Sequence, residues 1–214
     1  MISVLFSRPN HDITLNYLFY YCNDLVAESI EEGYKTLNKE NEEANKLIIE
    51  SVINKNKPKF IIFNGHGSPD EICGYKNETI ISSKNSQILK NSIVYSLSCS
   101  SALSLGPICI KNGTLAFIGY DVDFAIGKDP DSEASPRHDK IAKLFLEPSN
   151  ILVSSLLNGG SVKQAIEKSK DKMKSNIDYL HTTNSFPEAI HYAPFLFNNY
   201  LGLIAHGDKE ASIR

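Results

Sequence analysis

Short apolar runs alternate with longer amphipathic stretches along this chain. Four of the runs predict short buried strands: Ile2–Phe6, Phe60–Phe63, Ser92–Leu97 and Thr114–Tyr120. Apolar residues recur at helical spacing over five further stretches: 12–37, 41–53, 141–146, 151–157 and 162–173. Strands that alternate with helices predict an α/β three-layer sandwich, in which a mainly parallel central sheet carries helices on both faces.

The remaining segments fit within one domain. Residues 72–81 predict a hairpin, because Lys76 and Asn77 stand between two β-prone arms. Residues 121–140 are polar and rich in Asp, Ser and Pro, which predicts a long surface loop. The sequence shows neither an internal repeat nor a linker, so we expect a single domain over residues 1–214.

Composition and charge narrow the classes of function. The chain has 22 basic and 25 acidic residues, a net charge of −3, and no basic stripe, so we expect no nucleic-acid partner. Its four cysteines form no CxxC pair and have no cluster of histidines near them, which argues against a disulfide scaffold and a structural zinc site. Glycine-rich phosphate loops are absent, and we expect no cofactor. The apolar runs are too short for a membrane span or a signal peptide, so we expect a reduced, cytoplasmic protein with no membrane partner.

Two predicted strands end in side chains that can carry chemistry. The strand at 60–63 runs into His66, which lies between two glycines, and the strand at 92–97 runs into Cys99. If these strands are parallel neighbours, both side chains emerge at the carboxyl edge of the sheet, where catalytic groups gather in α/β proteins. A thiolate is a strong nucleophile, and an imidazole titrates near neutral pH and can protonate a leaving group. The backbone N–H groups of Gly67 and Cys99 are candidates for an oxyanion hole.

Each of these residues also has an ordinary structural interpretation. A histidine after a strand is usually a loop residue, and a buried cysteine usually packs as a small apolar side chain. The residues therefore leave three functions open. One is a thiol peptidase, the second is a non-catalytic module that holds a peptide or protein partner, and the third is a cysteine hydrolase that acts on a small molecule.

The order along the chain of the His66 strand and the Cys99 strand resembles that in the caspase-like cysteine peptidases, a group that includes caspases, legumain, gingipains, separase and clostripain. It resembles most closely the CHAT branch, which is named for caspase-like domains associated with tetratricopeptide repeats. The segments that carry the resemblance are Phe60–Asp70 (FIIFNGHGSPD), the hairpin at 72–81, Ser92–Ala102 (SIVYSLSCSSA), Gly113–Tyr120 (GTLAFIGY) and Ala193–Gly207. Together they span about residues 60–207, whereas the N-terminal 55 residues match only as a strand followed by helices.

The resemblance implies a cysteine endopeptidase that cleaves a protein or peptide substrate with a His–Cys dyad. Cys99 is then the nucleophile and His66 the proton donor, with the backbone of Gly67 and Cys99 forming the oxyanion hole. No third catalytic residue is required in such a dyad. Asp70 and Glu71 follow His66 closely enough to orient it, but we interpret them as solvated turn carboxylates. The alternative under the same resemblance is a catalytically silent caspase-like module that binds a partner.

The resemblance also implies where specificity and control lie. Family members commonly cleave after a charged P1 residue, and the pocket wall follows the strand after the nucleophile, where this chain has Asp121 and Asp123. An acidic pair favours Lys or Arg at P1, with Asp123 ahead of Asp121, although both can simply solvate a loop. Cleavage of the chain by itself after Lys128 or Arg137 is a further hypothesis. No residues are left for a repeat array, so we expect control by a separate sensor protein or by the chain's own loops.

Overall fold

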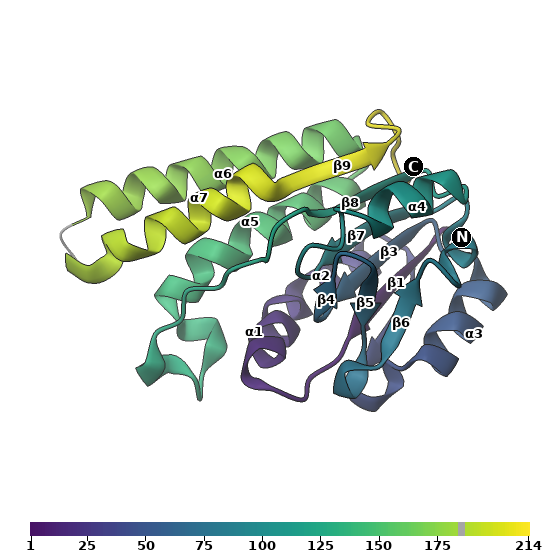
Figure 1. Cartoon of the computed structure of the whole chain (residues 1–214), viewed down its shortest axis with the longest axis horizontal. Helices are drawn as coiled ribbons and strands as arrows, with labels where there is room; N and C mark the ends of the chain where they lie inside the picture. Colours follow the sequence, from purple (N-terminus) through teal and green to yellow (C-terminus); the bar gives the residue numbers. More distant parts are fainter. Residues whose placement is uncertain (184–186) are drawn as a thin grey trace.

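The computed structural model describes residues 1–183 and 187–214, and Figure 1 shows their arrangement. A six-stranded sheet lies at the centre, with its strands in the spatial order β2 (Lys35–Glu40), β1 (Ser3–Arg8), β3 (Phe60–Asn64), β7 (Ile93–Leu97), β8 (Ala116–Tyr120) and β9 (Leu203–Gly207). Neighbouring strands from β2 to β8 run parallel, and β9 runs antiparallel to β8 at one edge. The mainly parallel sheet predicted from the sequence is confirmed.

The strands predicted from apolar runs are β1, β3, β7 and β8, and their side chains alternate between two cores, one on each face of the sheet. In β3, Phe60 and Ile62 belong to the first core, and Ile61 and Phe63 belong to the second. All four side chains are fully buried. Burial on both faces explains why these strands are continuous apolar runs rather than alternating ones.

Helices cover both cores, which confirms the three-layer sandwich. The first core is covered by α1 (Ile13–Tyr21), α2 (Asn23–Glu31), α5 (Lys140–Leu157) and α6 (Val162–Thr182). The second core is covered by α3 (Lys46–Asn56) and α4 (Leu105–Lys111). A last helix, α7 (Ala193–Gly202), leads directly into β9, and α5, α6 and α7 reach beyond the sheet on one side (Figure 1).

A small antiparallel sheet follows β3 and consists of β4 (Gly67–Ser68), β5 (Glu71–Cys73) and β6 (Thr79–Ser82). β5 and β6 form the predicted hairpin, and Lys76 and Asn77 in its turn have positive φ angles of 54° and 60°. Short 3-10 helices complete the described chain: η1 (Asn41–Glu43), η2 (Tyr75–Asn77), η3 (Ser86–Leu89), η4 (Pro130–Ser132), η5 (Pro136–His138) and η6 (Pro187–Tyr192).

The helix predicted over 12–37 is wrong in its last part. The stretch forms two helices, α1 and α2, and α2 ends before Gly33, which has a φ of 77°. The chain then forms β2, so Leu37 lies in a strand paired with β1. β2 is an edge strand with a half-exposed surface, which is why its sequence lacks an apolar run. The helix predicted over 41–53 begins after Asn45, whose side chain caps α3.

The two helices predicted at 141–146 and 151–157 are one helix, α5, which continues through Pro148. A proline inside a helix has no N–H, so the carbonyl of Leu144 loses its partner in the helix. Asn176 of α6 replaces that partner, because its Nδ2 donates to the Leu144 oxygen at 2.8 Å. The proline is therefore tolerated through a contact between α5 and α6 that the local sequence does not reveal.

The long polar loop predicted at 121–140 is confirmed, and a buried carboxylate anchors its end. Asp139 is fully buried and caps α5 by accepting hydrogen bonds from the N–H groups of Ile141 and Ala142 at 2.9 Å each. Its other oxygen accepts from Tyr17 Oη at 2.8 Å and from the Asp129 N–H at 2.9 Å. This carboxylate ties the loop to α1 and to the start of α5.

We expect Asp139→Ala to destabilise the protein by about 3 kcal/mol, because the change removes a helix cap and leaves the buried Tyr17 hydroxyl without its acceptor. Urea unfolding monitored by circular dichroism measures the loss. A matched change of the exposed Asp131 to Ala should alter the midpoint little. Equal stability of the Asp139→Ala and wild-type proteins would contradict the anchoring role.

Candidate active site

The two candidate catalytic side chains lie at the carboxyl ends of adjacent strands. β3 and β7 are parallel neighbours, and Asn64 in β3 pairs with Leu97 in β7. His66 and Cys99 each follow that pair by two residues, so both chains leave the sheet at the same level and on the same edge. This is the arrangement expected if the two strands are neighbours.

The loop after His66 packs directly against the loop that carries Cys99. A Cβ atom at Gly67 would lie 2.9 Å from the Ser98 Cβ and 3.0 Å from the Glu71 carbonyl oxygen, so any larger residue would push the loops apart. The N–H of Leu105, the first residue of α4 after the Cys99 loop, donates to the Pro69 oxygen of the His66 loop at 2.8 Å. The glycine is needed here for close approach rather than for a special backbone angle.

A carboxylate fixes the orientation of His66. The Nε2 atom of His66 lies 2.7 Å from Oδ2 of Asp12, and the side chains are 38% and 36% exposed. Asp12 is also the N-cap of α1, since its Oδ1 accepts from the Leu15 N–H at 2.8 Å. Burial opposes ionisation, but the Leu15 N–H and His66 outweigh it and hold the pKa of Asp12 below its usual value.

Because an ionised carboxylate can only accept hydrogen bonds, Nε2 of His66 carries a proton and donates to Asp12. The Nδ1 atom is therefore the nitrogen left to exchange a proton with a reacting group. The sequence interpretation missed Asp12. Its available signal was an acidic residue just past the end of the first strand and directly before a helical stretch.

The carboxylates that follow His66 in sequence do not contact it. Asp70 is exposed, and the Oε2 atom of Glu71 accepts a hydrogen bond from the Thr79 hydroxyl on the neighbouring strand. The interpretation as a solvated turn carboxylate therefore holds for Asp70 and is wrong for Glu71, which is half-buried in β5. The residue that orients His66 is instead Asp12, which lies in the loop between β1 and α1. This loop is close to His66 because β1 pairs with β3.

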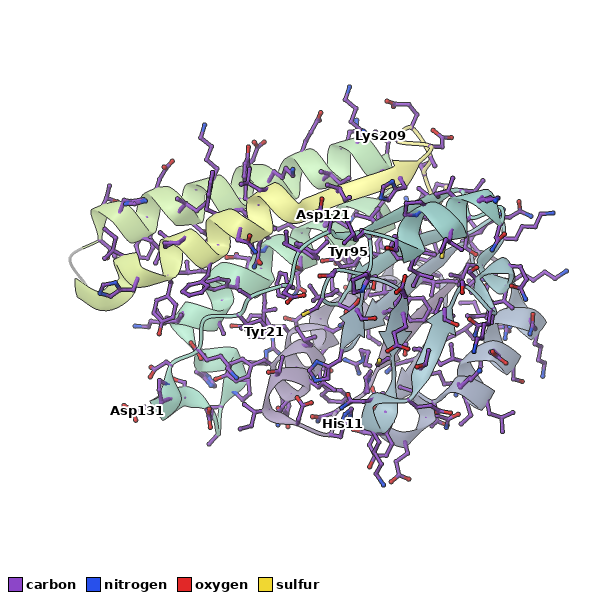
Figure 2. The ribbon with its side chains drawn as sticks, in the orientation of Figure 1. His11, Tyr21, Tyr95, Asp121, Asp131 and Lys209 are labelled. Atoms are coloured by element: carbon purple, nitrogen blue, oxygen red, sulfur yellow. The ribbon has the colours of Figure 1, made fainter. Side chains whose placement is uncertain are left out.

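A second histidine, His11, lies close to the hydrogen-bonded pair of His66 and Asp12. The ring of His11 lies 6.4 Å from the ring of His66 and 5.4 Å from that of Tyr75, edge-on in both cases. His11 Nδ1 accepts from the Lys76 N–H, and its Nε2 lies near Asn77 Oδ1, both at 3.3 Å. His11 therefore ties the Asp12 loop to the hairpin turn, and Figure 2 labels it at this end of the molecule.

Cys99 lies half-buried under the loop that follows β8. Its Sγ is 4.0 Å from the Phe124 oxygen, and the next residue, Ser100, turns sharply with a φ of 54°. Burial raises the pKa of the Cys99 thiol, and the negative charge of Asp123 raises it further. The resting sulfur is therefore a protonated thiol at neutral pH.

The serines around Cys99 are structural. Ser96, Ser98 and Ser101 are buried, and their hydroxyl groups bond to one another at distances of 2.6 to 3.0 Å. The Ser100 hydroxyl donates to Asp123 Oδ1 at 2.7 Å. These contacts hold the turn that presents Cys99, and they occupy the serine hydroxyls, so the thiol is the candidate nucleophile of this loop.

The two acidic residues expected in a P1 pocket lie in different surroundings. Asp123 is exposed, and its charge acts on Cys99. Asp121 is half-buried, lies against Gly202 and acts electrostatically on Lys170. The structure thus places Asp123 near Cys99 and Asp121 near α6 and α7.

The loop residues Lys128 and Arg137 are both held in place. The Lys128 carbonyl accepts from the Tyr192 hydroxyl at 3.3 Å, and the exposed Arg137 forms an ion pair with Asp24 at 2.6 Å. Self-cleavage after either residue stays a hypothesis.

Neither a metal centre nor a membrane helix emerges from residues 1–183 and 187–214. Within these ranges, no three His, Cys, Asp or Glu side chains come together in a way that could hold a metal ion. The same ranges contain no helix that is both long and apolar enough to span a membrane.

Solved structures of cysteine peptidases share this fold. Over 99% of the chain, the crystal structure of the Arg-specific cysteine proteinase gingipain R superposes with a TM-score of 0.59 and 12% identity. A complex of the pro- and mature domains of RgpB from Porphyromonas gingivalis gives 0.60 and 10% over 100% of the chain. A structure described as a protease gives 0.62 and 11% over 99%.

These likenesses define the class of fold. The protein has the α/β fold of the caspase-like gingipain peptidases, with a mainly parallel six-stranded sheet. It spans about half the length of these chains, 47% to 48%. No protein-family model and no curated protein matches the sequence, and the CHAT branch stays a prediction.

We expect iodoacetamide to label Cys99 first among the four cysteines, with a rate that rises with pH as the thiol ionises. The other thiols are buried, and burial raises the pKa of Cys22 and Cys73 to about 11 and that of Cys109 to about 12. Peptide mass mapping after timed labelling at pH 7 to 9 measures the order. Asp123→Asn should speed labelling of Cys99, since it removes a charge that raises this pKa. Equal labelling of Cys73 and Cys99 would contradict the prediction.

Proposed function

We propose that this protein is a cysteine endopeptidase in which Cys99 attacks the substrate carbonyl and His66 transfers the proton. The observation that carries the proposal is the pairing of β3 with β7, which brings the His66 and Cys99 loops into contact at one sheet edge. The hydrogen bond between His66 and Asp12 adds a fixed orientation that an ordinary loop histidine does not need. The fold shared with gingipain R supports the same class of chemistry.

The mechanism starts from the thiol form of Cys99. When the thiol attacks, its proton passes to Nδ1 of His66, and a bond forms between Sγ and the carbonyl carbon. The imidazolium, held by the Asp12 carboxylate, then donates this proton to the leaving amine as the C–N bond breaks. Water hydrolyses the resulting thioester and returns the proton to Cys99. Asp12 acts through His66 and is a positioning residue.

The oxyanion of the tetrahedral intermediate needs hydrogen-bond donors, and two backbone groups have this role in the proposal. The Cys99 N–H has no hydrogen-bond partner among the described residues. Gly67 pairs with Ile72 next to the bonded pair of His66 and Cys73. In an antiparallel ladder that position turns its N–H away from β5, which leaves it available to a substrate.

We further propose a basic P1 residue, with Asp123 as the main acidic group. Asp123 is exposed and close enough for its charge to act on Cys99. Its Oδ2 has no hydrogen-bond partner among the described residues, whereas Asp121 faces Lys170. The gingipain R structure is that of an Arg-specific proteinase, which agrees with this preference.

The test is incubation of a mixture of folded and denatured proteins with the wild type and with Cys99→Ala, followed by mapping of new amino termini by mass spectrometry. We expect new termini in the wild-type sample, mostly after Lys or Arg. Termini after acidic or small residues would overturn the P1 preference alone. Identical termini in both samples would overturn the peptidase and favour the silent binding module.

A further inference from the structure

The last strand of the central sheet leaves one edge unpaired. Backbone bonds from Asp121 to Gly202 at 3.0 Å and from Asp208 to Leu115 at 2.9 Å fix the pairing of β9 with β8. In an antiparallel ladder alternate residues face the neighbour, so residues 204 and 206 bond to β8. Residues 203, 205 and 207 then face outward.

Those outward backbone groups form a template for another strand. The Leu203 N–H bonds to the end of α7. Leu203 itself is buried. Both backbone groups of Ala205 and the Gly207 N–H have no partner among the described residues, and Ala205 is half-buried and Gly207 exposed. An unpaired edge of this kind pairs readily with an extended segment of another chain.

A groove runs along this edge and is walled by α6. Its volume is about 480 Å³, and it is lined by Leu203, Ile204 and Ala205 of β9, four residues of α6, and Lys209. Figure 1 shows α6 alongside β9, and Figure 2 labels Asp121 near the start of β9 and Lys209 beyond its end. The groove therefore lies beside the first three residues of β9 and reaches Lys209 beyond the end of the strand.

The charge of the groove is positive, in a chain whose net charge is −3. Lys163, Lys170 and Lys209 line it, and Glu167 is the acidic residue among its lining. Within the described residues, none of the three lysines has an ion pair with a carboxylate at 4.0 Å or less. Burial lowers the pKa of Lys170, although the charge of Asp121 opposes this change. A carboxylate bound in the groove would offset the desolvation of this ammonium group.

We propose that the groove between α6 and β9 binds an extended acidic segment of a partner protein, which adds to the sheet as a strand beside β9. Its backbone pairs with Ala205 and Gly207, and alternate acidic side chains meet the lysines. Two copies of this chain joined here would bring the same lysines together, which disfavours self-pairing. The site lies outside the catalytic loops and needs no reaction at Cys99.

The test uses the full chain with Cys99→Ala and a fluorescein-labelled peptide of alternating valine and glutamate. We expect micromolar binding by fluorescence polarisation, at least ten-fold weaker binding of the matched valine–lysine peptide, and loss of affinity at high salt. Methylation of alternate peptide nitrogens should also weaken binding at least ten-fold, because it removes donors to β9. Equal affinity for the acidic and basic peptides would overturn the proposal.

Two variants locate the binding to this edge. Ala205→Pro removes an outward N–H and spares the ladder to β8, so we expect at least ten-fold weaker binding. Lys163→Glu with Lys170→Glu should have a similar effect, whereas the control Lys168→Glu with Lys174→Glu, also on α6 but outside the groove, should not. Thermal unfolding checks that each variant folds. Unchanged binding by the first two variants would overturn the proposal. Self-association in sedimentation that Ala205→Pro abolishes would overturn it in favour of a second copy.

Discussion

We expect His66→Ala to lower kcat/KM by about 10²- to 10⁴-fold on a substrate identified by terminus mapping, the range expected for loss of a positioned proton donor. The reason lies in the resting thiol. Burial and Asp123 raise the pKa of Cys99. In the proposed reaction the attack of the thiol therefore depends on a neighbouring base, and the leaving amine needs a proton. His66 is the imidazole at this sheet edge whose Nδ1 is left free by the bond to Asp12. Initial rates of the wild type and the variant measure the effect.

Two controls separate this role from a structural one. His138 is an exposed loop histidine, and His138→Ala should leave kcat/KM within about two-fold of the wild type. Added imidazole should restore part of the activity of His66→Ala, because a small base can enter the space left by the ring. A variant that folds and retains full activity would show that proton transfer does not pass through His66.

The central sheet and the two catalytic candidates were predictable because both depend on short-range patterns. Buried parallel strands appear as continuous apolar runs, and the residues just after them occupy the carboxyl edge. His66 and Cys99 follow two such runs, so their proximity required only that β3 and β7 be neighbours. The edge strand β2 was not predictable in this way, since one face of it is half-exposed and its apolar residues are few.

The contact of Asp12 with His66 could not be predicted from the sequence, because one partner of Asp12 is close in sequence and the other is distant. Its bond to Leu15 is local and is typical of a helix N-cap, which already explains an Asp at that position. Its bond to His66 depends on the register between β1 and β3, which places Ser7 beside Phe63 and the following loop beside His66. The same holds for Asn176 and Leu144, whose contact exists only when α5 and α6 pack together.

We expect Asp12→Asn to lower kcat by about 10²- to 10⁴-fold with a smaller change in KM, as happens when a catalytic histidine is held in the wrong tautomer. Asparagine can still cap α1 through its oxygen, but its amide group presents hydrogens to Nε2 of His66. The substitution also removes the negative charge that stabilises the imidazolium. The matched control is Asp70→Asn, an exposed carboxylate nearer in sequence, which should have little effect.

The double variant and the pH dependence of stability test the same contact independently. If Asp12 acts through His66, adding Asp12→Asn to His66→Ala should cost little further activity, whereas additive losses would contradict the coupling.

The folded-state pKa of Asp12 lies below its unfolded value, so its contribution to stability is present above about pH 4 and is lost as the pH falls through the lowered pKa. Urea unfolding between pH 7 and pH 3 should therefore show a smaller acid-induced loss for Asp12→Asn than for the wild type. Parallel curves would mean that the carboxylate gains nothing from Leu15 and His66 in the folded protein.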